Sequence, residues 1–463
     1  MQVSIIRKSG IVSDFRIDAE CYQEKYILVE KKLSTLKHTL LGKEVSIFCK
    51  GIFDIKAECY SDSGIPFVRI GNLKDYVIDQ NNITYIPKLE HIRNHKSALR
   101  RGDVILSKTA YPAASFVDIY ECNTSQDTIA LKLKENSQIV SEYLVIFLNS
   151  KFGLNQMERW FTGNIQMHLN LLDSRNIIIP ILTKTLQETI KTLFSSAIRL
   201  KKQSVLEFNQ AQSLLLSELG LTNWQPKHQL TFIKNYFDTQ HAGRIDAEYF
   251  QPKYEEIEEA IKCYSGGYTF IKDEFAQNKS TFNIDDKKLY QYVEIGSVNV
   301  STGEIIAVDV LGADLPANAK RVLKKNDIII SKVRTYRGAI TIVEEDGFVG
   351  SGAFTVLRVI GSINKETLLT FLHSKPLLAW SLKPNTGTSY PVIVNDDILN
   401  LPVPTLPEEK QTQIQKNVTE SFTLRKQSKH LLECSKQAVE MAIEQDEQTA
   451  INWLENETNE MQK

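Results

Sequence analysis

Basic, amide, hydroxyl and aromatic side chains gather in two pairs of predicted loops, and their types suit contacts with DNA. The first pair contributes Lys108, Thr109, Tyr111, Asn164, Gln166 and His168. The second pair contributes Lys332, Arg334, Tyr336, Arg337, Thr388, Ser389 and Tyr390. Lysine and arginine neutralise phosphates, whereas arginine can pair with guanine and asparagine or glutamine with adenine. These residues are therefore candidate DNA contacts, and the alternative for each is a solvated loop side chain.

Short apolar runs that read as buried strands precede these loops. Asp103-Val-Ile-Leu-Ser-Lys108 and Asp327-Ile-Ile-Ile-Ser-Lys332 each lead into the first loop of a pair. The second loop contains Thr-Gly, at 162–163 and 386–387, and in the first copy it is expected to be a polar loop over 161–170. Aliphatic runs bounded by polar residues and glycine are typical of strands. A helix over Glu142–Leu154 is expected just before that loop.

The longest predicted element is a helix over residues 183–221. Ile190, Phe194 and Ile198 begin an apolar seam at helical spacing, with Lys, Glu and Gln between its members. Gly220 is the expected C-terminal stop, because glycine readily adopts the left-handed conformation that ends many helices. At about 1.5 Å per residue, the helix would be a rod of roughly 58 Å, which is too long for an ordinary core helix.

A duplication with a period near 225 residues runs through the sequence. Pro180–Gly220 aligns without a gap with Pro404–Glu444 (404 − 180 = 224), and the apolar seam is kept while the polar residues change. Arg16-Ile-Asp-Ala-Glu recurs as Arg244-Ile-Asp-Ala-Glu, 228 residues later. Because the period far exceeds that of solenoid repeats, we expect two homologous halves, each a strand-rich domain followed by a long helix. Further matched pairs are Phe67 and Tyr292, Asp103 and Asp327, and Thr162 and Thr386.

Composition places few constraints on function. The 463 residues are 42% hydrophobic and 24% charged, with a formal net charge of −1, so any DNA footprint must come from local clustering of basic residues. The N-terminus lacks the features of a signal segment, and no apolar run approaches the 18 or so residues needed to span a bilayer. Six scattered cysteines without a Cys-x-x-Cys pair favour a reduced, cytoplasmic protein without membrane contact.

No catalytic motif is found in the sequence. It contains no glycine-rich nucleotide loop, no His-Glu-x-x-His, no Cys/His set with zinc spacing and no Gly-x-Ser-x-Gly. A nuclease would need a second carboxylate beside Asp103 or Asp327 to share a metal, and neither copy has one adjacent. A fused methyltransferase would carry Asn/Asp-Pro-Pro-Tyr, which the Tyr-Pro pairs at 111–112 and 390–391 do not supply. We therefore expect no catalytic residue and no metal, with both aspartates in strand-entrance turns.

Taken in order, these motifs resemble the specificity subunit of type I restriction-modification systems along nearly the whole chain. The resemblance rests on the paired Arg-Ile-Asp-Ala-Glu segments, the strand pairs at Phe67/Tyr292 and Asp103/Asp327, the Thr-Gly loops and the Pro-led entries into the long helices. Gln187 and Gln411 occupy the family's Pro-x-x-x-x-x-x-Gln position. One departure is Leu182-Thr-Lys-Thr, where the second copy has Leu406-Pro-Glu-Glu.

The resemblance implies an α/β fold with two homologous target-recognition domains. Their curved sheets would be separated by two long, conserved helices packed antiparallel. The implied boundaries are a first recognition domain, a central spacer helix, a linker, a second recognition domain and a C-terminal conserved helix, at 1–182, 183–221, 222–240, 241–406 and 407–463. The paired Arg-Ile-Asp-Ala-Glu segments are expected to have a structural role where the domains join the helices, rather than to contact DNA.

The resemblance also implies a non-catalytic role in a larger complex. Each recognition domain would read one half of a bipartite, asymmetric sequence in double-stranded DNA, and the helices would set the gap between the halves. The partners would be two modification (methyltransferase) subunits and the restriction (translocase and nuclease) subunits. The chain itself would need no cofactor, since S-adenosylmethionine and ATP would bind the partners. A protein-interaction scaffold without DNA binding and, less favoured, a nuclease remain the alternatives.

Overall fold

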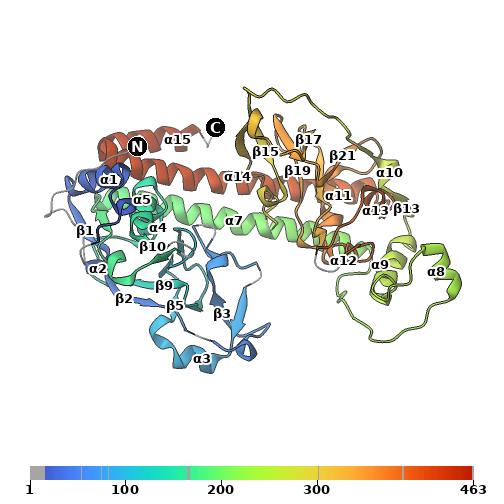
Figure 1. Ribbon diagram of the computed structural model, residues 1–463, viewed down its shortest axis with the longest axis horizontal. Coiled ribbons are helices and arrows are strands. Elements are labelled where there is room, and N and C mark those ends of the chain that lie inside the picture. Colours follow the sequence, from blue (N-terminus) through green and yellow to red (C-terminus); the bar gives the residue numbers. More distant parts are fainter. Residues whose placement is uncertain are drawn as a thin grey trace. The chain divides into compact units, whose positions relative to one another are not determined.

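The computed structural model describes residues 16–53, 55–73, 76–81, 83–163, 167–300, 302–387 and 390–460. The chain divides into two units, of which unit 1 comprises Met1–Lys201 with Arg425–Lys463 and unit 2 comprises Lys202–Leu424 (Figure 1). Each unit mixes helices with several small sheets, and long helices accompany them. This architecture confirms the predicted α/β class.

Two four-stranded sheets form most of the β-structure of unit 1, in the orders β2-β9-β6-β7 and β4-β3-β8-β5. Most neighbouring strands run antiparallel, while β3 and β8 are parallel. A further antiparallel pair joins β1 (His38–Leu40) to β12 (Ile178–Pro180). The strands of the two larger sheets are β2 (Val45–Lys50), β3 (Ile65–Val68), β4 (Thr84–Ile86), β5 (Leu99–Arg100), β6 (Val104–Ser107), β7 (Ala114–Phe116), β8 (Glu121–Thr124) and β9 (Thr128–Leu133).

Most helices of unit 1 are short. The long ones lie where the chain passes into unit 2 and where it returns. The expected helix over Glu142–Leu154 is two helices, because the first ends at Leu148 and Ser150 caps the next by accepting a hydrogen bond from the backbone of Gly153. The short helices are η2 (Ala19–Tyr22), α1 (Glu24–Ser34), α2 (Leu41–Glu44), η3 (Ala57–Cys59), η4 (Ile70–Asn72), α3 (Lys88–Arg93), η5 (His95–Ser97), α4 (Ser141–Leu148), α5 (Lys151–Trp160) and α6 (Leu171–Ser174).

Unit 2 contains two four-stranded sheets in the orders β14-β21-β18-β19 and β16-β15-β20-β17. Here β15 and β20 form the parallel pair, and β13 (Tyr268–Phe270) pairs antiparallel with β22 (Pro402–Pro404). The sheet strands are β14 (Phe275–Gln277), β15 (Leu289–Val293), β16 (Val308–Leu311), β17 (Ala319–Val322), β18 (Ile328–Ser331), β19 (Ile340–Ile342), β20 (Phe348–Ser351) and β21 (Phe354–Val359). The short helices are α8 (Tyr236–Ala242), α9 (Pro252–Lys262), α10 (Ile271–Glu274), η6 (Ile295–Ser297), η7 (Gly312–Asp314), η8 (Thr335–Arg337), α11 (Lys365–Leu372), α12 (Lys375–Trp380) and α13 (Asn395–Leu399).

The strand orders of the two units correspond strand for strand. In the first sheet of each, β2, β9, β6 and β7 match β14, β21, β18 and β19 in order along the chain and in pairing. In the second sheet, β4, β3, β8 and β5 match β16, β15, β20 and β17 in the same way, including the single parallel pair. Halves that share sequence motifs at a fixed offset therefore also share a topology.

The strand before each candidate loop is buried on both faces. In β6, Val104 and Leu106 belong to a core that includes α4 and α7 (Lys184–Glu218), while Ile105 faces the core of the second sheet. In β18, Ile328 and Ile330 likewise pack on the helical side and Ile329 on the other. Burial on both faces explains why these strands are continuous apolar runs rather than alternating ones.

Two long helices bear out the predicted pattern in most respects. Helix α7 ends two residues before Gly220, which has φ +68°, and the N–H of Leu221 donates to the carbonyl of Leu216 at 2.8 Å, so Gly220 is the predicted stop. The segment 407–463 forms two helices rather than one, α14 (Glu408–Glu444) and α15 (Glu447–Glu460). Among the described residues, no helix is long and apolar enough to cross a membrane.

Segments of α7 and α14 run antiparallel within each unit. In unit 1, Ser428 Oγ donates to the carbonyl of Ala197 at 2.7 Å, and Thr183 donates to Glu447 just beyond the end of α14. In unit 2, Ser421 Oγ donates to the carbonyl of Ser204 at 2.8 Å. The other end of the same unit 2 pairing is an ion pair between Lys410 and Glu218 at 2.9 Å.

Gln187 and Gln411 join the long helices to the rest of unit 1 and of unit 2 in the same way. Gln187 accepts a hydrogen bond from the backbone of Val140, before α4, and donates to the carbonyl of Leu182. Gln411 accepts from the backbone of Asn364, before α11, and donates to the carbonyl of Leu406. Both amides are buried, so these bonds satisfy groups that would otherwise be costly to bury.

Candidate nucleic-acid interface

The Thr-Gly segment of unit 1, expected to be a polar loop, is a β-hairpin. Strand β10 (Phe161–Thr162) pairs antiparallel with β11 (His168–Leu169), placing Thr162 opposite His168. Gly163, the residue after β10, has φ +118°, a backbone conformation that residues other than glycine rarely adopt. The sequence pattern missed the hairpin because each strand has only two residues, too few for an alternation to show.

This hairpin pairs with the loop that follows β6. Thr109 forms an antiparallel bridge with His168, and the N–H of Leu169 donates to the carbonyl of Lys108 at 2.7 Å. The N–H of Ala110 donates to the carbonyl of Met167 at 3.3 Å. Two loops predicted separately are therefore one continuous structure, which brings Lys108, Thr109 and His168 together.

Unit 2 repeats this pairing at positions 224 residues later in the sequence. Thr386 and Val333 both form bridges with Val392. The N–H of Ile393 donates to the carbonyl of Lys332 at 2.9 Å, and the N–H of Arg334 donates to the carbonyl of Pro391 at 2.8 Å. These pairs correspond one to one with those of unit 1. Each unit thus has one loop–hairpin pair, the name used below for the loop after β6 or β18 together with the Thr-Gly hairpin.

Unusual backbone angles also coincide in the two loop–hairpin pairs. Gly387 has φ +117°, close to the value at Gly163. Ala110 and Arg334, which correspond in the repeat, both have positive φ, at +65° and +50°. Non-glycine residues adopt such angles rarely and at some energetic cost. The same backbone conformation therefore displays a methyl group in unit 1 and a guanidinium in unit 2.

Aromatic rings support the arginines of the unit 2 pair. The guanidinium carbon of Arg334 lies 5.1 Å from the centre of the Tyr390 ring, and that of Arg337 lies 6.0 Å from the Tyr336 ring. In the part of the chain that the structure describes, no carboxylate lies within ion-pair distance of Arg334 or Arg337, or of Lys108 or Lys332. Cations without an acidic partner, stacked on aromatic rings, are well placed to bind an external anion or a base edge.

Lys332 lies in an environment that disfavours its own charge. Partial burial lowers the pKa of its ammonium group, and the nearby positive charge of Arg321 on β17 lowers it further. A phosphate oxygen placed between two such cations would offset both effects. A bound anion would therefore stabilise the charged form of Lys332.

Tyr111 and His168 of unit 1 differ in how much of their hydrogen-bonding capacity is used. The Tyr111 hydroxyl donates to the carbonyl of Ile70 at 2.9 Å, and burial raises the pKa of this phenol. The residue is still 39% exposed, and since its hydroxyl already has a partner, the ring is what remains for an external contact. Nδ1 of His168 is buried and has no hydrogen-bond partner among the described residues. Of the other candidates, Asn164, Gln166, Thr388 and Ser389 lie outside the described residues.

Arg16 and Arg244, absent from the candidate set, hold the bases of the two hairpins. Arg16 forms a two-point ion pair with Asp18 and donates to the carbonyls of Arg159 and Phe161. Arg244 has the same arrangement in unit 2, where it pairs with Asp246 and contacts the backbone carbonyls of residues 384 and 385. The hydrogen bonds from Arg244 lower the pKa of Asp246. The repeated Arg-Ile-Asp-Ala-Glu segment marked these two arginines in the sequence, but the sequence did not show that they bind the bases of the hairpins.

Asp103 and Asp327 occupy strand-entrance turns. Oδ2 of Asp103 accepts from the backbone N–H of Arg100 at 2.8 Å, and Oδ2 of Asp327 accepts from that of Lys324 at 3.0 Å. Asp327 is fully buried and also forms an ion pair with Arg358 at 2.9 Å. Burial raises the pKa of the Asp103 carboxyl. These contacts fit the turn role, and in Asp327 they use both carboxylate oxygens.

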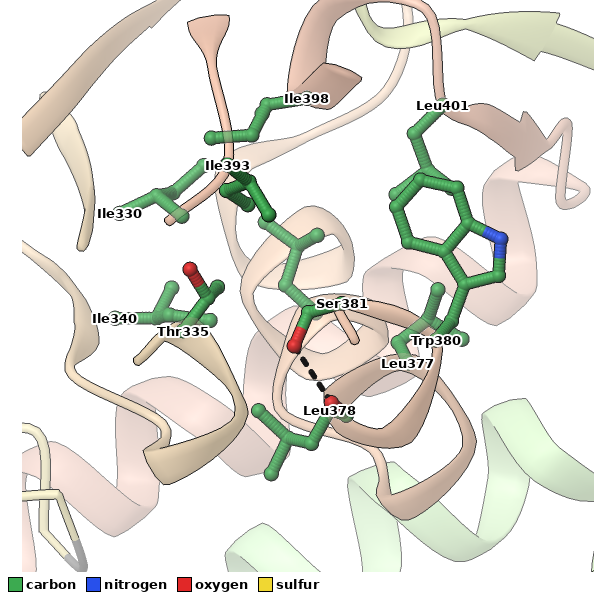
Figure 2. A pocket seen from close by; sticks show the side chains of 11 residues that line it. Ile330, Thr335, Ile340, Leu377, Leu378, Trp380, Ser381, Ile393, Ile398 and Leu401 are labelled. Carbon is green, nitrogen blue, oxygen red and sulfur yellow. Dashed lines mark hydrogen bonds between the residues drawn. The ribbon is translucent and has the colours of Figure 1, made fainter. Parts of the chain in front are cut away.

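Figure 2 shows the side chains that line a small apolar cavity in unit 2. Thr335 of η8, Ile393 after the hairpin and Trp380 of α12 all line it, so loop and hairpin rest on the same core. The volume of about 20 Å³ would hold about one water molecule. The hydroxyl of Ser381 donates to the carbonyl of Leu378 at 2.7 Å, and that of Thr335 to the carbonyl of Ser331. The cavity is a packing gap within the core on which the loop rests.

Comparisons with known proteins give structural neighbours only. A scan against protein-family models and a search of curated proteins found no match. The similar solved structures include the S subunit of a type I restriction-modification system from M. genitalium, at 14% identity and TM-score 0.43, covering 88% of this chain and 94% of that one.

Two further solved structures are similar over most of this chain. The HsdS subunit from Thermoanaerobacter tengcongensis is 15% identical, with 89% of this chain and 97% of that chain covered at a TM-score of 0.27. A chain from a structure describing complex assembly of the type I R-M system is also 15% identical, with coverage of 89% and 98% and a TM-score of 0.29. Because all three TM-scores lie below 0.5, we base the function proposed below on the chain's own duplicated loop–hairpin pairs.

Proposed function

We propose that this chain is the DNA sequence-specificity subunit of a type I restriction-modification complex. Each loop–hairpin pair reads one half of a bipartite, asymmetric site in double-stranded DNA. The subunit carries no catalytic residues of its own and directs the chemistry of its partners to a sequence. It acts in the cytoplasm, where the chromosomal DNA of a bacterial cell lies.

One observation carries the proposal: two loop–hairpin pairs share a backbone conformation and differ in their side chains. Bridges, interloop hydrogen bonds and positive-φ positions correspond between the units, whereas Ala110 corresponds to Arg334 and His168 to Val392. A duplicated enzyme site would keep its reactive groups in both copies. Two copies of one scaffold with different displayed side chains instead suit the reading of two different half-sites.

The side chains divide into phosphate and base contacts by their surroundings. Lys108 and Lys332 leave equivalent strand ends and are only partly exposed, which suits short-range contact with a phosphate. Arg334 and Arg337 have forked guanidinium groups stacked on tyrosines, which suits bidentate contact with guanine. In unit 1, the partly exposed His168 and Tyr111 rings lie in the same loop–hairpin pair and suit contact with a base.

The long helices are proposed to measure the gap between half-sites and to bind the partner subunits. Their inner faces pack within the units through residues such as Ser204, Ser421 and Ser428, which leaves the mixed Lys, Glu and Gln faces for other chains. Two modification subunits would supply S-adenosylmethionine-dependent methylation of adenine. Restriction subunits would supply ATP-driven translocation and cleavage.

Methylome sequencing tests the proposal most directly. The gene would be expressed with its presumed modification partner in cells that lack other adenine methyltransferases. Two short methylated half-sites separated by a fixed gap are the expected result. If the partner methylates DNA with another specificity subunit but not with this chain, the protein-interaction scaffold becomes the better interpretation.

A further inference from the structure

Three side chains with metal-binding atoms meet where α14 and α15 pack together in unit 1. His430 and Cys434 lie four residues apart on α14 and therefore share one helix face. Glu457 approaches them from α15. Sγ of Cys434 is 3.5 Å from Nε2 of His430, which is 3.9 Å from a carboxylate oxygen of Glu457. One potential ligand atom from each residue lies within 4.8 Å of the others.

We propose that His430, Cys434 and Glu457 form a binding site for a divalent transition-metal ion of the zinc class, which fastens the end of α15 to α14. The chain would supply three ligands: a thiolate, an imidazole nitrogen and a carboxylate oxygen. A water molecule would complete a four-coordinate shell.

The types of ligand atom and the distance between Sγ of Cys434 and Nε2 of His430 both suit zinc. Thiolate and imidazole ligands select zinc over magnesium or calcium, and carboxylate is a common third zinc ligand. With Zn–S near 2.3 Å and Zn–N near 2.0–2.1 Å, sulfur and nitrogen in a tetrahedral shell lie about 3.5 Å apart. The Cys434–His430 distance of 3.5 Å equals this separation. Two adjustments would complete the shell. Sγ also lies 4.0 Å from Nδ1 and therefore beside the ring, so the exposed imidazole would turn to direct Nε2 at the ion, and the Glu457 carboxylate would move inward from a spacing of up to 4.8 Å.

Access to the site is from the solvent side. Cys434 is 2% exposed and forms the floor, whereas the side chains of His430 and Glu457 are 45% and 33% exposed. An ion could therefore reach the cluster without opening the helix pair. The exposed side leaves room for the fourth ligand.

A metal here would complete the attachment of α15. The beginning of this 14-residue helix is already fixed, because Asp446 caps its first turn and Glu447 accepts hydrogen bonds from Thr183. Ala450 and Leu454 bury its middle in the core of unit 1. Glu457 is the ligand nearest the other end, so the ion would secure the last turn. A helix this short gains most of its stability from such tertiary contacts.

The competing interpretation assigns no ligand. In that case His430 and Glu457 form a long surface ion pair, and Cys434 is a small apolar residue in the core. The two interpretations differ in whether the thiol, the imidazole and the carboxylate act together on one ion.

Cobalt and zinc titration of the full-length protein separates them. After treatment with a chelator, the protein would be titrated with Co²⁺, whose bond to a thiolate gives a near-ultraviolet charge-transfer band, and the band would then be displaced by Zn²⁺. We expect one ion per chain, with the band lost in Cys434→Ser and kept in Cys263→Ser, which alters an exposed cysteine on unit 2. Absence of the band, or its persistence in Cys434→Ser, would overturn the proposal.

Exposed ligands provide a test that does not depend on the buried cysteine. His430→Gln and Glu457→Gln keep size and polarity at accessible positions, so both variants should fold. Each should weaken zinc binding by more than the roughly 10–100-fold typical for loss of an outer-shell partner. Zinc should also slow amide hydrogen exchange in 447–460 of the unaltered protein and not in these variants. Unchanged affinity in both variants would contradict the site.

Discussion

The guanidinium of Arg334 lies over the ring of Tyr390 at 5.1 Å, joining the two halves of the unit 2 loop–hairpin pair through their side chains. The backbone joins them as well, since the N–H of Arg334 donates to the carbonyl of Pro391. Arg334 has a positive φ, a backbone conformation that few residues other than glycine adopt, and this conformation sets the direction of its side chain. A ring and a strained backbone thus fix the orientation of a cation that has no acidic partner in the described part of the chain.

Arg334→Ala should relax recognition of one half-site and leave the other unchanged. A bidentate contact with a base is worth about 1–3 kcal/mol, so discrimination at one base pair should fall by roughly 5–150-fold. Competition binding of the assembled methyltransferase complex, with each half-site varied in turn, would measure this. Lys262→Ala is a matched control, because Lys262 is an exposed cation of the same unit that pairs with Glu258 on α9. An equal loss on all DNA would reassign Arg334 to phosphate contact.

Arg244→Gln should impair only the half-site that unit 2 reads. The substitution removes charge-assisted hydrogen bonds to the backbone at the hairpin base, each worth about 1.5–3 kcal/mol. Arg16→Gln should have the reciprocal effect on the unit 1 half-site. Lysine at either position should rescue poorly, because it lacks the planar fork that reaches the aspartate and both carbonyls. The measurement is methylation of substrates that carry one altered half-site.

A general structural role would give a different outcome for these two variants. If Arg244→Gln and Arg16→Gln reduced methylation equally on every substrate, in proportion to a common loss of thermal stability, the hairpins would not depend individually on these arginines. Thermal unfolding of each variant is therefore measured alongside methylation.

Inserting one helical turn into both long helices should change the gap between half-sites. Four residues added after Lys201 in α7 and four after Leu424 in α14 lengthen each helix by about 6 Å. At about 3.4 Å per base pair, the methylated site should gain roughly two base pairs of spacer. Methylome sequencing would report the new gap. Altered half-site sequences with an unchanged gap would contradict the measuring role of the helices.

His373 should make unit 2 less stable in mild acid. The residue is half-buried, with Nε2 2.6 Å from the carbonyl of Ile340, and desolvation lowers the pKa of the imidazole. The unfolded chain therefore binds a proton below about pH 6.5 that the folded chain does not. The free energy of unfolding should fall with decreasing pH in that range, by up to about 1.4 kcal/mol per pH unit.

Denaturation by urea at pH 7.5 and 5.5 would measure the effect of His373. His373→Gln keeps a side-chain donor for Ile340 and removes the titration, so the variant should lose less stability between the two pH values than the unaltered protein. Equal losses in both proteins would show that other groups account for the acid sensitivity.

Some features could be predicted from the sequence because their cause is local. The apolar seam and Gly220 located the end of α7, since helical periodicity and a left-handed cap depend on neighbouring residues. The aliphatic runs after Asp103 and Asp327 located β6 and β18, which are buried on both faces. The nearly constant offset between the repeated motifs likewise predicted two homologous halves.

Other features depended on residues that are far apart in the sequence. The pairing of the Thr-Gly hairpins with the preceding loops and the anchoring of each hairpin by Arg16 or Arg244 join segments about 60 to more than 140 residues apart. His430, Cys434 and Glu457 lack a zinc spacing and meet only because α15 folds back on α14. Local patterns determine helices, strands and turns, whereas hydrogen bonds and packing between distant segments choose which side chains share a surface. The tertiary structure decided which residues lie together, because it joined the two predicted loops of each unit and brought Glu457 to His430 and Cys434.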